Sequence, residues 1–241
     1  MNPAVTSRHA TFRWSQAPEG EPAELQLWPQ RGAFDAHRSC LFVADAHFGK
    51  DHTFRRHGLA VPASTEQATL HRLDTLLALT QAQHLVFLGD LFHGPASHDP
   101  SALAPLQAWR ESHPALNITL VRGNHDHHAG DPPPGLGMAV RSGPWRLGPW
   151  ALMHEPEPLA GAYALGGHWH PGVVLQERGR TRLRLPCFHF HRQHGILPAL
   201  GDFTGLHIGR RSGDDEVFAV VEEAATVMPL PTHRSVPHGQ R

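Results

Sequence analysis

The chain has 241 residues, with 21 Lys and Arg against 22 Asp and Glu and a formal net charge of −1. This length allows one substantial hydrophobic core. The near-neutral charge excludes a strongly positive electrostatic field over the whole protein, so a nucleic acid would have to bind a local patch of basic residues. Cys40 and Cys187 lie in apolar runs typical of buried thiols, which favours a reducing compartment. No run has the apolar length of a signal peptide or a membrane span. We therefore expect a cytoplasmic protein without membrane contact.

The first half of the chain reads as strands that alternate with helices. Residues 1–22 are polar and contain prolines, and we expect an N-terminal extension with at most an edge strand. The strands expected after it lie at residues 24–28, 32–34, 41–45, 85–90 and 118–122. Leucines at helical spacing behind a capping-box pattern predict a helix at 64–80. Because this helix joins two apolar strands, we expect a right-handed crossover with parallel strands that end at Asp45 and Asp90.

The rest of the chain changes from helical to β periodicity. A second helix is expected at 101–112, with Pro105 in its first turn, and residues 48–56 and 131–135 read as loops. Short strands are then expected at 138–141, 145–147, 150–153, 163–165, 173–177, 181–185 and 217–222. We therefore expect one domain at 23–227 and a disordered tail at 228–241.

Residues that bind metals or move protons follow directly after four of the apolar strands. The chain has 22 histidines, so one His alone is weak evidence and only spacing and context count. The blocks are, in order, Asp45-x-His47, Gly89-Asp90, Gly123-Asn124-His125-Asp126, His154 and Gly167-His168-Trp169-His170. Ligands collect outside the carboxyl ends of strands in layered α/β folds, so four such endings predict one shared site.

The residue types in these blocks are those of a dinuclear metal centre. Such a centre needs one carboxylate that bridges two cations, with imidazole, carboxylate and amide oxygen around them. Residues i and i+2 of an extended segment point the same way, so Asp45 and His47 can reach one cation together. The glycines before Asp90, Asn124 and His168 allow tight turns and a close approach of the backbone.

The ordered blocks resemble the pattern D-x-H, G-D, G-N-H-[DE], H and G-H-x-H of the calcineurin-like metallophosphoesterase superfamily. This resemblance implies a four-layer α/β/β/α sandwich, a single domain without a separate cap domain, and a hydrolase that uses two divalent metal ions. It assigns to the first ion the ligands Asp45, His47, Asp90 and His170. It assigns to the second ion the ligands Asp90, Asn124, His154 and His168, with Asp90 bridging.

Further runs are similar to those of the ligase-associated DNA-damage-response endonucleases, the PdeM family, over about residues 24–208. These runs are Phe48-Gly49-Lys50, Arg122 to Asp126, Leu147-Gly148-Pro149, His154-Glu155-Pro156, Gly167 to Pro171, Arg184 to Phe188 and Phe203-Thr204-Gly205. The likeness implies an endonuclease of DNA repair that acts on single-stranded or unpaired DNA, uses manganese, and associates with a DNA ligase and a helicase. Ligand chemistry alone also admits Fe, Zn, Co or Ni.

The motif Asn124-His125-Asp126 also suggests how a proton is supplied. Two cations about 3.5–4 Å apart lower the pKa of a water between them, which provides the nucleophile. His125 lies next to a ligand residue without being needed as one, so it is the natural general acid for the leaving oxygen. We expect Asp126 to hold or polarise its imidazole.

Candidate contacts with the substrate are less specific. Lys50, Arg55 and Arg56 either bind a substrate phosphate or belong to a solvated loop, and Trp169 either stacks on a base or packs its loop. The alternating arginines expected on one strand face either follow a DNA backbone or guard an exposed edge; they are Arg178, Arg180, Arg182 and Arg184. We favour a surface position for His93 and core positions for Phe54 and Phe92.

Three functions remain open from the sequence. The leading hypothesis is a phosphodiesterase that cuts DNA, and the second is a phosphoesterase that cleaves nucleotides or other small esters. The third is a docking scaffold that has lost catalysis, which the intact ligand set disfavours. The chain has no obvious inserted cap domain, and this favours an open groove suited to a polymer.

Overall fold

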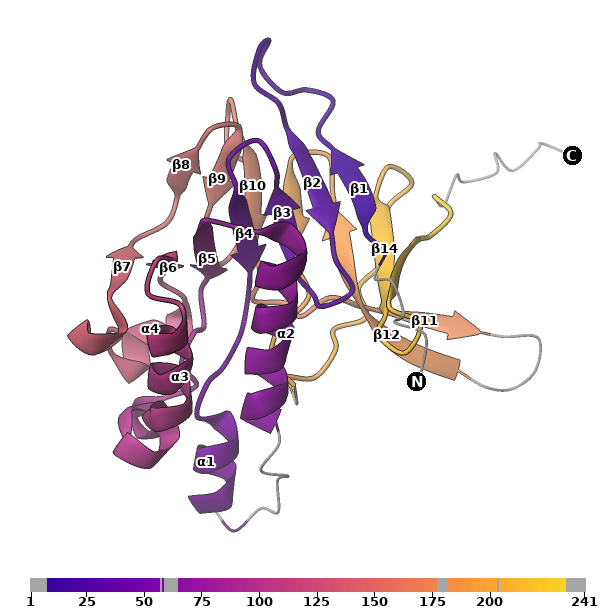
Figure 1. The fold of residues 1–241 in the computed structure, drawn as a ribbon. Coiled ribbons are helices and arrows are strands. Elements are labelled where there is room, and N and C mark those ends of the chain that lie inside the picture. The colour runs from indigo at the N-terminus through magenta and orange to yellow at the C-terminus, as the bar shows by residue number, and fades with distance from the viewer. Residues whose placement is uncertain (1–7, 57, 59–64, 177–181, 203, 233–241) are drawn as a thin grey trace, which may run out of the picture.

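The computed structural model describes residues 8–56, 58, 65–176, 182–202 and 204–232. Two sheets pack face to face, and helices cover the outer face of the first (Figure 1). The predicted α/β class with a sandwich of two sheets in one unit is confirmed. Arg178, Arg180 and Phe203, named above, lie outside the described residues, as do residues 64, 177, 181 and 233–241 of the expected elements.

The first sheet has the strand order β1-β2-β3-β4-β5-β6-β7. Its strands are β1 (Ala10–Arg13), β2 (Glu24–Leu27), β3 (Ala33–Asp35), β4 (Cys40–Val43), β5 (His84–Leu88), β6 (Asn117–Val121) and β7 (Met138–Arg141). Pairing is antiparallel from β1 to β4 and parallel from β4 to β7. The strands expected at 41–45 and 85–90 are therefore neighbours in a parallel sheet, as the crossover predicted.

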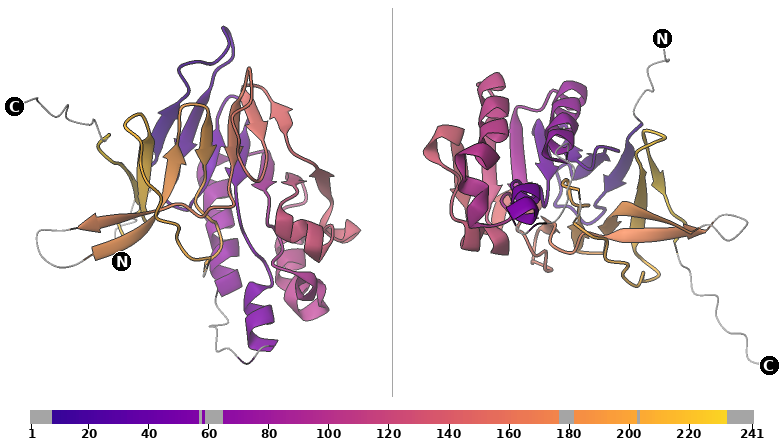
Figure 2. Two further views of the ribbon diagram at one scale, coloured as in Figure 1. Left: turned by 180° about the vertical axis from the view of Figure 1, so that it is seen from behind. Right: turned by 90° about the horizontal axis from the view of Figure 1, so that it is seen from below.

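The second sheet has the order β15-β14-β12-β13-β10-β9-β8, and β11 pairs with β12. Its strands are β8 (Trp145–Leu147), β9 (Trp150–Leu152), β10 (Tyr163–Gly166), β11 (Gly172–Gln176), β12 (Arg182–Phe190), β13 (His194–Ile196), β14 (Glu216–Val221) and β15 (Thr226–Pro229). The first part of β12 and β11 form a hairpin that projects from the sandwich (Figures 1 and 2). The strands β13 and β15 were not expected from the sequence.

The helices are α1 (Lys50–Arg56), α2 (Thr65–Thr80), α3 (Pro100–Ser112) and α4 (Asn124–Ala129), with short 3₁₀ turns at Pro95–His98 and Pro134–Leu136. The predicted helices at 64–80 and 101–112 are confirmed, but α3 begins at Pro100, so Pro105 lies beyond its first turn. In the described residues no helix lies on the second sheet, because the sequence after 138 lacks helical periodicity. A small apolar cluster around Val173, Leu185 and Cys187 occupies part of that face instead.

Alternate residues of the central strands face two cores. Leu41 and Val43 face the helices, where they meet Leu73 and Leu76 of α2. Phe42 and its equivalents on β5 and β6 face the second sheet. Because both faces of these strands are buried, they read as continuous apolar runs. Cys40 and Cys187 are buried free thiols, as the sequence predicted.

One local expectation is wrong. Residues 50–56, read as a loop, form α1, although the segment has no apolar periodicity. Its support is electrostatic: Asp51, in the first turn, pairs with Arg55 one turn later at 3.0 Å, and Arg56 pairs with Asp99 at 2.9 Å. A reading of hydrophobic pattern alone misses such a helix.

The first and last strands of the described residues both join the sandwich. β1 lies in the predicted N-terminal extension as an edge strand, and its Phe12 stacks on Phe190 with ring centroids 3.9 Å apart. β15 includes Met228 and Pro229, the first residues of the predicted tail. The domain boundaries at 23 and 227 remain a prediction. No helix in the described part of the chain is long and apolar enough to cross a membrane.

Candidate metal centre

The candidate ligands meet where both sheets present the carboxyl ends of parallel strands. β4, β5 and β6 are parallel neighbours, as are β9 and β10. Each of these strands is followed within three residues by a ligand candidate: Asp45, Asp90, Asn124, His154 and His168. The arrangement follows from topology, since parallel strands place their carboxyl ends at one edge of a sheet.

The first group of donors is formed by Asp45, His47 and His170, whose ligand atoms lie within 4.8 Å of one another. His47 Nε2 is 3.5 Å from His170 Nε2, and His170 Nε2 is 3.8 Å from Asp45 Oδ1. Asp90 Oδ2 lies 3.9 Å from His47 Nε2. Ligands about 2.0–2.2 Å from one ion lie about 3–4 Å from each other, so the spacing suits a shared cation.

The second group is formed by Asp90, His154 and His168, again within 4.8 Å of one another, with Asn124 beside them. Asn124 Oδ1 lies 2.9 Å from His154 Nε2 and 3.1 Å from His168 Nδ1. His154 Nε2 is 3.4 Å from Asp90 Oδ1. The two oxygens of Asp90 therefore face different groups, which is the arrangement of a bridging carboxylate.

Hydrogen bonds orient two of the imidazoles for this purpose. His154 donates from Nδ1 to the carbonyl of Leu88 at 3.0 Å, and His170 donates from Nδ1 to the carbonyl of Thr204 at 2.8 Å. Each bond places the proton on Nδ1 and leaves the lone pair of Nε2 facing the centre.

Buried charge at the site favours a cation. Burial lowers the pKa of His47 to about 2, so this imidazole is neutral and able to act as a ligand. Burial opposes a charge on His154 too, but its hydrogen bond with Asp90 and the charge of Asp45 outweigh this effect and raise its pKa to about 9. The carboxylates thus favour positive charge at the point where the second group converges. Imidazole, carboxylate and amide oxygen together fit divalent transition-metal ions.

The ligand loops have an unusual backbone. Five ligand candidates have positive φ: Asp45 at 53°, His47 at 49°, Asp90 at 50°, His168 at 70° and His170 at 44°. Non-glycine residues rarely adopt this left-handed conformation, and it persists only where surrounding structure holds it. Such strain is concentrated at functional sites.

Glycines allow the ligands to come this close. A Cβ added to Gly89 would meet the imidazole of His154, and one added to Gly123 would meet Asp90 Oδ1. Gly89 also has a φ of +83°, which L-residues rarely adopt. The close approach that the sequence suggested for these positions is present.

Comparison with known proteins gives one decisive likeness. A scan of protein-family models and a search of curated proteins find no match. The nuclease MPE of Pseudomonas putida, a solved structure, is 37% identical with a TM-score of 0.77, covering 92% of this chain and 100% of that chain. The chain belongs to the calcineurin-like metallophosphoesterases, in the family of this nuclease. The E. coli phosphoesterase YfcE covers 75% of this chain and 86% of that chain, with 20% identity and a TM-score of 0.36.

As a member of this family the chain is a metal-binding hydrolase. His125, which lies beside the two groups of candidate ligands, is therefore a candidate for proton transfer. His125 donates from Nδ1 to the carbonyl of His93 at 2.8 Å, which leaves Nε2 free. Its ring centroid lies 5.0 Å from that of His47, in an edge-on arrangement. Its backbone N–H donates to Asp90 Oδ1 at 3.0 Å. The backbone of residue 125 therefore positions the carboxylate shared by both groups, while its side chain faces the centre.

The role expected for Asp126 is wrong. Its buried carboxylate accepts hydrogen bonds from the backbone N–H groups of Gly123 at 2.9 Å and Phe92 at 3.1 Å, and the imidazole of His125 is bonded elsewhere. Asp126 therefore holds the start of α4 against the loop after β5. It positions the loop that carries Asn124 and His125.

The surface position favoured for His93 is also wrong. Its ring stacks on that of His125, with centroids 5.2 Å apart, and it forms a further group of potential ligands with His47 and His125. The available signal was its position three residues after Asp90, at the same strand end. Because the chain has 22 histidines, the position of one histidine near a strand end was weak evidence, and a surface location was favoured. Phe92 is buried as expected, whereas Phe54 is only partly buried.

The candidate substrate contacts lie at different distances from the centre. Lys50 is close: burial lowers its pKa, and the charges of Asp45 and Asp90 oppose that shift. Arg55 and Arg56 are held in the ion pairs of α1 described above.

The remaining candidates lie on the second sheet and its loops. Trp169 is 40% exposed, and its ring lies 5.9 Å from that of His168. Arg182 and Arg184 are exposed on β12, and Arg184 donates to the carbonyl of Leu206 at 3.1 Å. Arg180 lies outside the described residues. Contact of any of these side chains with substrate remains a prediction.

Proposed function

We propose that this metallophosphoesterase is a DNA endonuclease of the cytoplasm that acts in repair and uses two divalent metal ions. The observation that carries the proposal is the pair of donor groups that share Asp90, with one of its oxygens facing each group. The 37% identity to a nuclease over its whole length supports a nucleic acid as the substrate.

Seven side chains would hold the ions. Asp45, His47, Asp90 and His170 would hold the first ion, and Asp90, Asn124, His154 and His168 would hold the second. When bound, the two ions supply a water activated as a nucleophile at neutral pH and neutralise charge on the phosphate. Manganese is our choice of ion from the resemblance, and loading with Mn, Fe, Zn, Co or Ni before assay tests it.

His125 supplies the proton in this proposal. The bond from Nδ1 to the carbonyl of His93 fixes the ring, so Nε2 is the nitrogen that faces the reacting phosphate. In the imidazolium form Nε2 also carries a proton, which would pass to the leaving 3′ or 5′ oxygen as the P–O bond breaks and leave the ring neutral. His93 positions this ring in two ways, because its carbonyl accepts the hydrogen bond and its own ring stacks against the imidazole.

Exposure of the site supports a polymeric substrate. Asn124 is exposed and Trp169 is 40% exposed, both within the second group or next to it. In the described part of the chain no inserted domain covers these side chains. An extended single strand can reach the centre there, with Trp169 available to stack on a base and Lys50 available to bind phosphate.

The test is a cleavage panel with purified protein and Mn²⁺. Its substrates are circular single-stranded DNA, duplex DNA and bis-nitrophenyl phosphate. Cutting of the circle identifies an endonuclease, since a circle has no end. Asp90→Asn should lose more than about 100-fold in rate, because it removes a charge shared by both ions. Glu111→Gln, an equivalent change on the exposed face of α3, should keep full activity.

The outcomes separate the competing functions. Hydrolysis of the small ester without DNA cleavage would favour a small-molecule or nucleotide phosphoesterase. No hydrolysis of any substrate with any of the five metals would favour a non-catalytic scaffold. Association with a DNA ligase and a helicase is a separate expectation from the resemblance, and co-purification from the source cell tests it.

A further inference from the structure

A second cluster of metal-ligating side chains lies near the start of β10 and shares no residue with the catalytic centre. His189 lies on β12 between Phe188 and Phe190, whose rings face the core between the sheets. His191 directly follows the strand, and its ring centroid lies 4.2 Å from that of His189. Both histidines therefore project to the side of this segment that faces away from the core between the sheets. The nearby Tyr163 is the first residue of β10, the strand whose other end leads to the catalytic centre.

A carboxylate completes this cluster. Asp215 lies between the imidazoles: Oδ2 is 3.0 Å from His189 Nε2, and Oδ1 is 2.8 Å from His191 Nδ1. All three donor atoms lie within 4.8 Å of one another, and Asp215 is only 2% exposed. Ser212 holds the carboxylate from behind, donating from its backbone N–H and its hydroxyl at 2.7 Å each.

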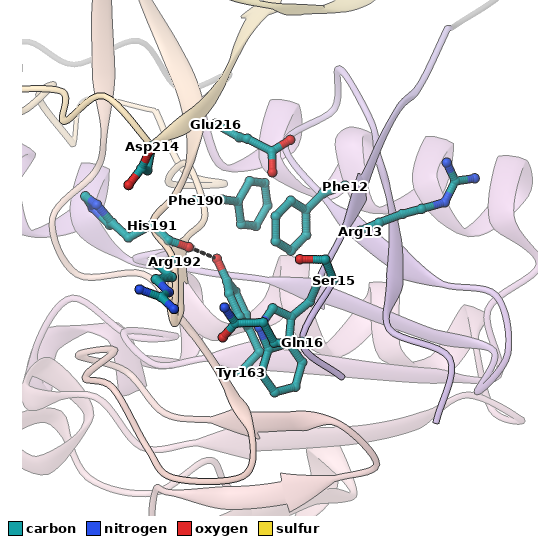
Figure 3. A pocket seen from close by; sticks show the side chains of 11 residues that line it. Phe12, Arg13, Ser15, Gln16, Tyr163, Phe190, His191, Arg192, Asp214 and Glu216 are labelled. Atoms are coloured by element: carbon teal, nitrogen blue, oxygen red, sulfur yellow. Dashed lines mark hydrogen bonds between the residues drawn. The ribbon is translucent and has the colours of Figure 1, made fainter. Parts of the chain in front are cut away.

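The surroundings fix the ligand atoms before any ion binds. The hydroxyl of Tyr163 shares its one proton between the carbonyl of His191, at 2.7 Å (Figure 3), and that of His194, at 2.8 Å. This contact holds the turn between β12 and β13. The ring of His194 stacks on that of His191, with centroids 4.4 Å apart. Preorganisation of this kind, through neighbours that orient each ligand, is typical of metal sites.

The spacing requires little change to admit an ion. Ligands about 2.0–2.1 Å from a tetrahedral ion lie about 3.3 Å apart, only a few tenths of an ångström more than the nitrogen–oxygen distances seen here. Water can reach the cluster, since the side chain of His191 is 28% exposed. His191 and Arg192 also line a pocket of about 290 Å³ (Figure 3).

We propose that His189, His191 and Asp215 form a third metal site, which binds one Zn²⁺ or a similar borderline ion. Two imidazoles and one carboxylate select Zn, Co or Ni over Mg or Ca. The ion would join the end of β12 to the turn at 212–215, with water as its fourth ligand. This inference is independent of the proposed nuclease activity, because it concerns different residues and is tested by counting ions.

The experiment measures bound zinc per chain in the full-length protein. Protein stripped with a chelator is incubated with excess Zn²⁺, desalted, and analysed by mass spectrometry of its metal content. His191→Gln should bind about one ion fewer than the wild type. His71→Gln, which removes an exposed histidine on α2, should bind the wild-type number. Mn²⁺-dependent phosphoesterase activity of His191→Gln should equal that of the wild type, since this side chain is outside the catalytic centre.

Equal zinc content in the wild type and His191→Gln would overturn the inference and leave a hydrogen-bonded network only. Loss of an ion in His71→Gln as well would overturn it too, since the binding would then not depend on this cluster. If His191→Gln does not fold by circular dichroism, Asp215→Asn takes its place in the same count. Asp215→Asn keeps the shape of the side chain and removes the charge that the ion needs.

Discussion

Removal of the imidazole of His125 separates proton donation from metal binding. In His125→Ala the backbone N–H of residue 125 still donates to Asp90 Oδ1, so the carboxylate shared by both metal groups keeps its position. The ring makes one hydrogen bond, to the carbonyl of His93, and is only partly buried. Its loss should cost about 1 kcal/mol of folding stability, too little to unfold the protein.

The expected effect on rate depends on the leaving group. A positioned general acid contributes about 10²–10⁴-fold, or about 3–5 kcal/mol, when the leaving oxygen is an alkoxide that needs a proton. Nitrophenolate is stable without a proton, so the same variant should lose less than about tenfold on bis-nitrophenyl phosphate. His125→Ala should therefore lose DNA cleavage far more than cleavage of the activated ester.

The assay compares kcat on single-stranded DNA with kcat on bis-nitrophenyl phosphate, at saturating Mn²⁺, for the wild type and His125→Ala. Metal content and melting temperature are measured on the same samples. An equal loss on both substrates, with metal content unchanged, would refute proton donation by this side chain. Loss of metal would instead make His125 part of the ligand set.

Two further changes test the packing around the ligand Asp45 and the burial of Glu66 on α2. Gly167→Ala would place a Cβ against the carboxylate of Asp45, so Mn²⁺ affinity should fall at least about tenfold. Gly135→Ala is the control, because its Cβ meets no atom within 4 Å and Mn²⁺ affinity should not change. Calorimetric titration with Mn²⁺ measures both affinities. Burial, then the charge of Asp51, raises the pKa of Glu66 to about 7. Because the folded protein favours the neutral form of Glu66, this carboxyl contributes stability that is complete below about pH 4.5 and is lost as pH rises through 7. The free energy of unfolding of Glu66→Gln, measured in urea, should therefore exceed that of the wild type at pH 8 and equal it at pH 4. A stability difference that is the same at both pH values contradicts this assignment.

The sequence was sufficient to find the strand ends that meet at the site. Asp45 and Asp90 follow buried apolar runs, and a helix with regular leucine spacing lies between the runs, so a parallel pair was the simple solution. α1 and α4 were not found because neither is stabilised by an apolar face. α1 is supported by ion pairs, and α4 begins where Asp126 accepts the backbone N–H of Gly123.

Side-chain direction in loops was the weakest part of the prediction. The expectation that Asp126 holds His125 came from their adjacency in sequence, but adjacent residues on a helix do not face each other. α4 begins at Asn124, so Asp126 faces Phe92 while His125 faces the centre. Only the three-dimensional course of the loop after β5 brings the carbonyl of His93 to His125.

The side chains of Asp45 and His47 converge as the sequence predicts, but their backbone conformation is not the predicted one. In an extended strand, residues i and i+2 point the same way, and the sequence predicts this conformation for Asp45 and His47. Both residues instead have left-handed backbone, and the neighbouring strand holds them: the backbone N–H of Asp45 donates to the carbonyl of Gly89 at 3.2 Å, and that of His47 donates to the carbonyl of Asp90 at 2.9 Å. The loop that carries the first ligands is thus fixed by the loop that carries the shared carboxylate. Because each strained loop depends on the other, a change that loosens one should displace ligands of both ions together.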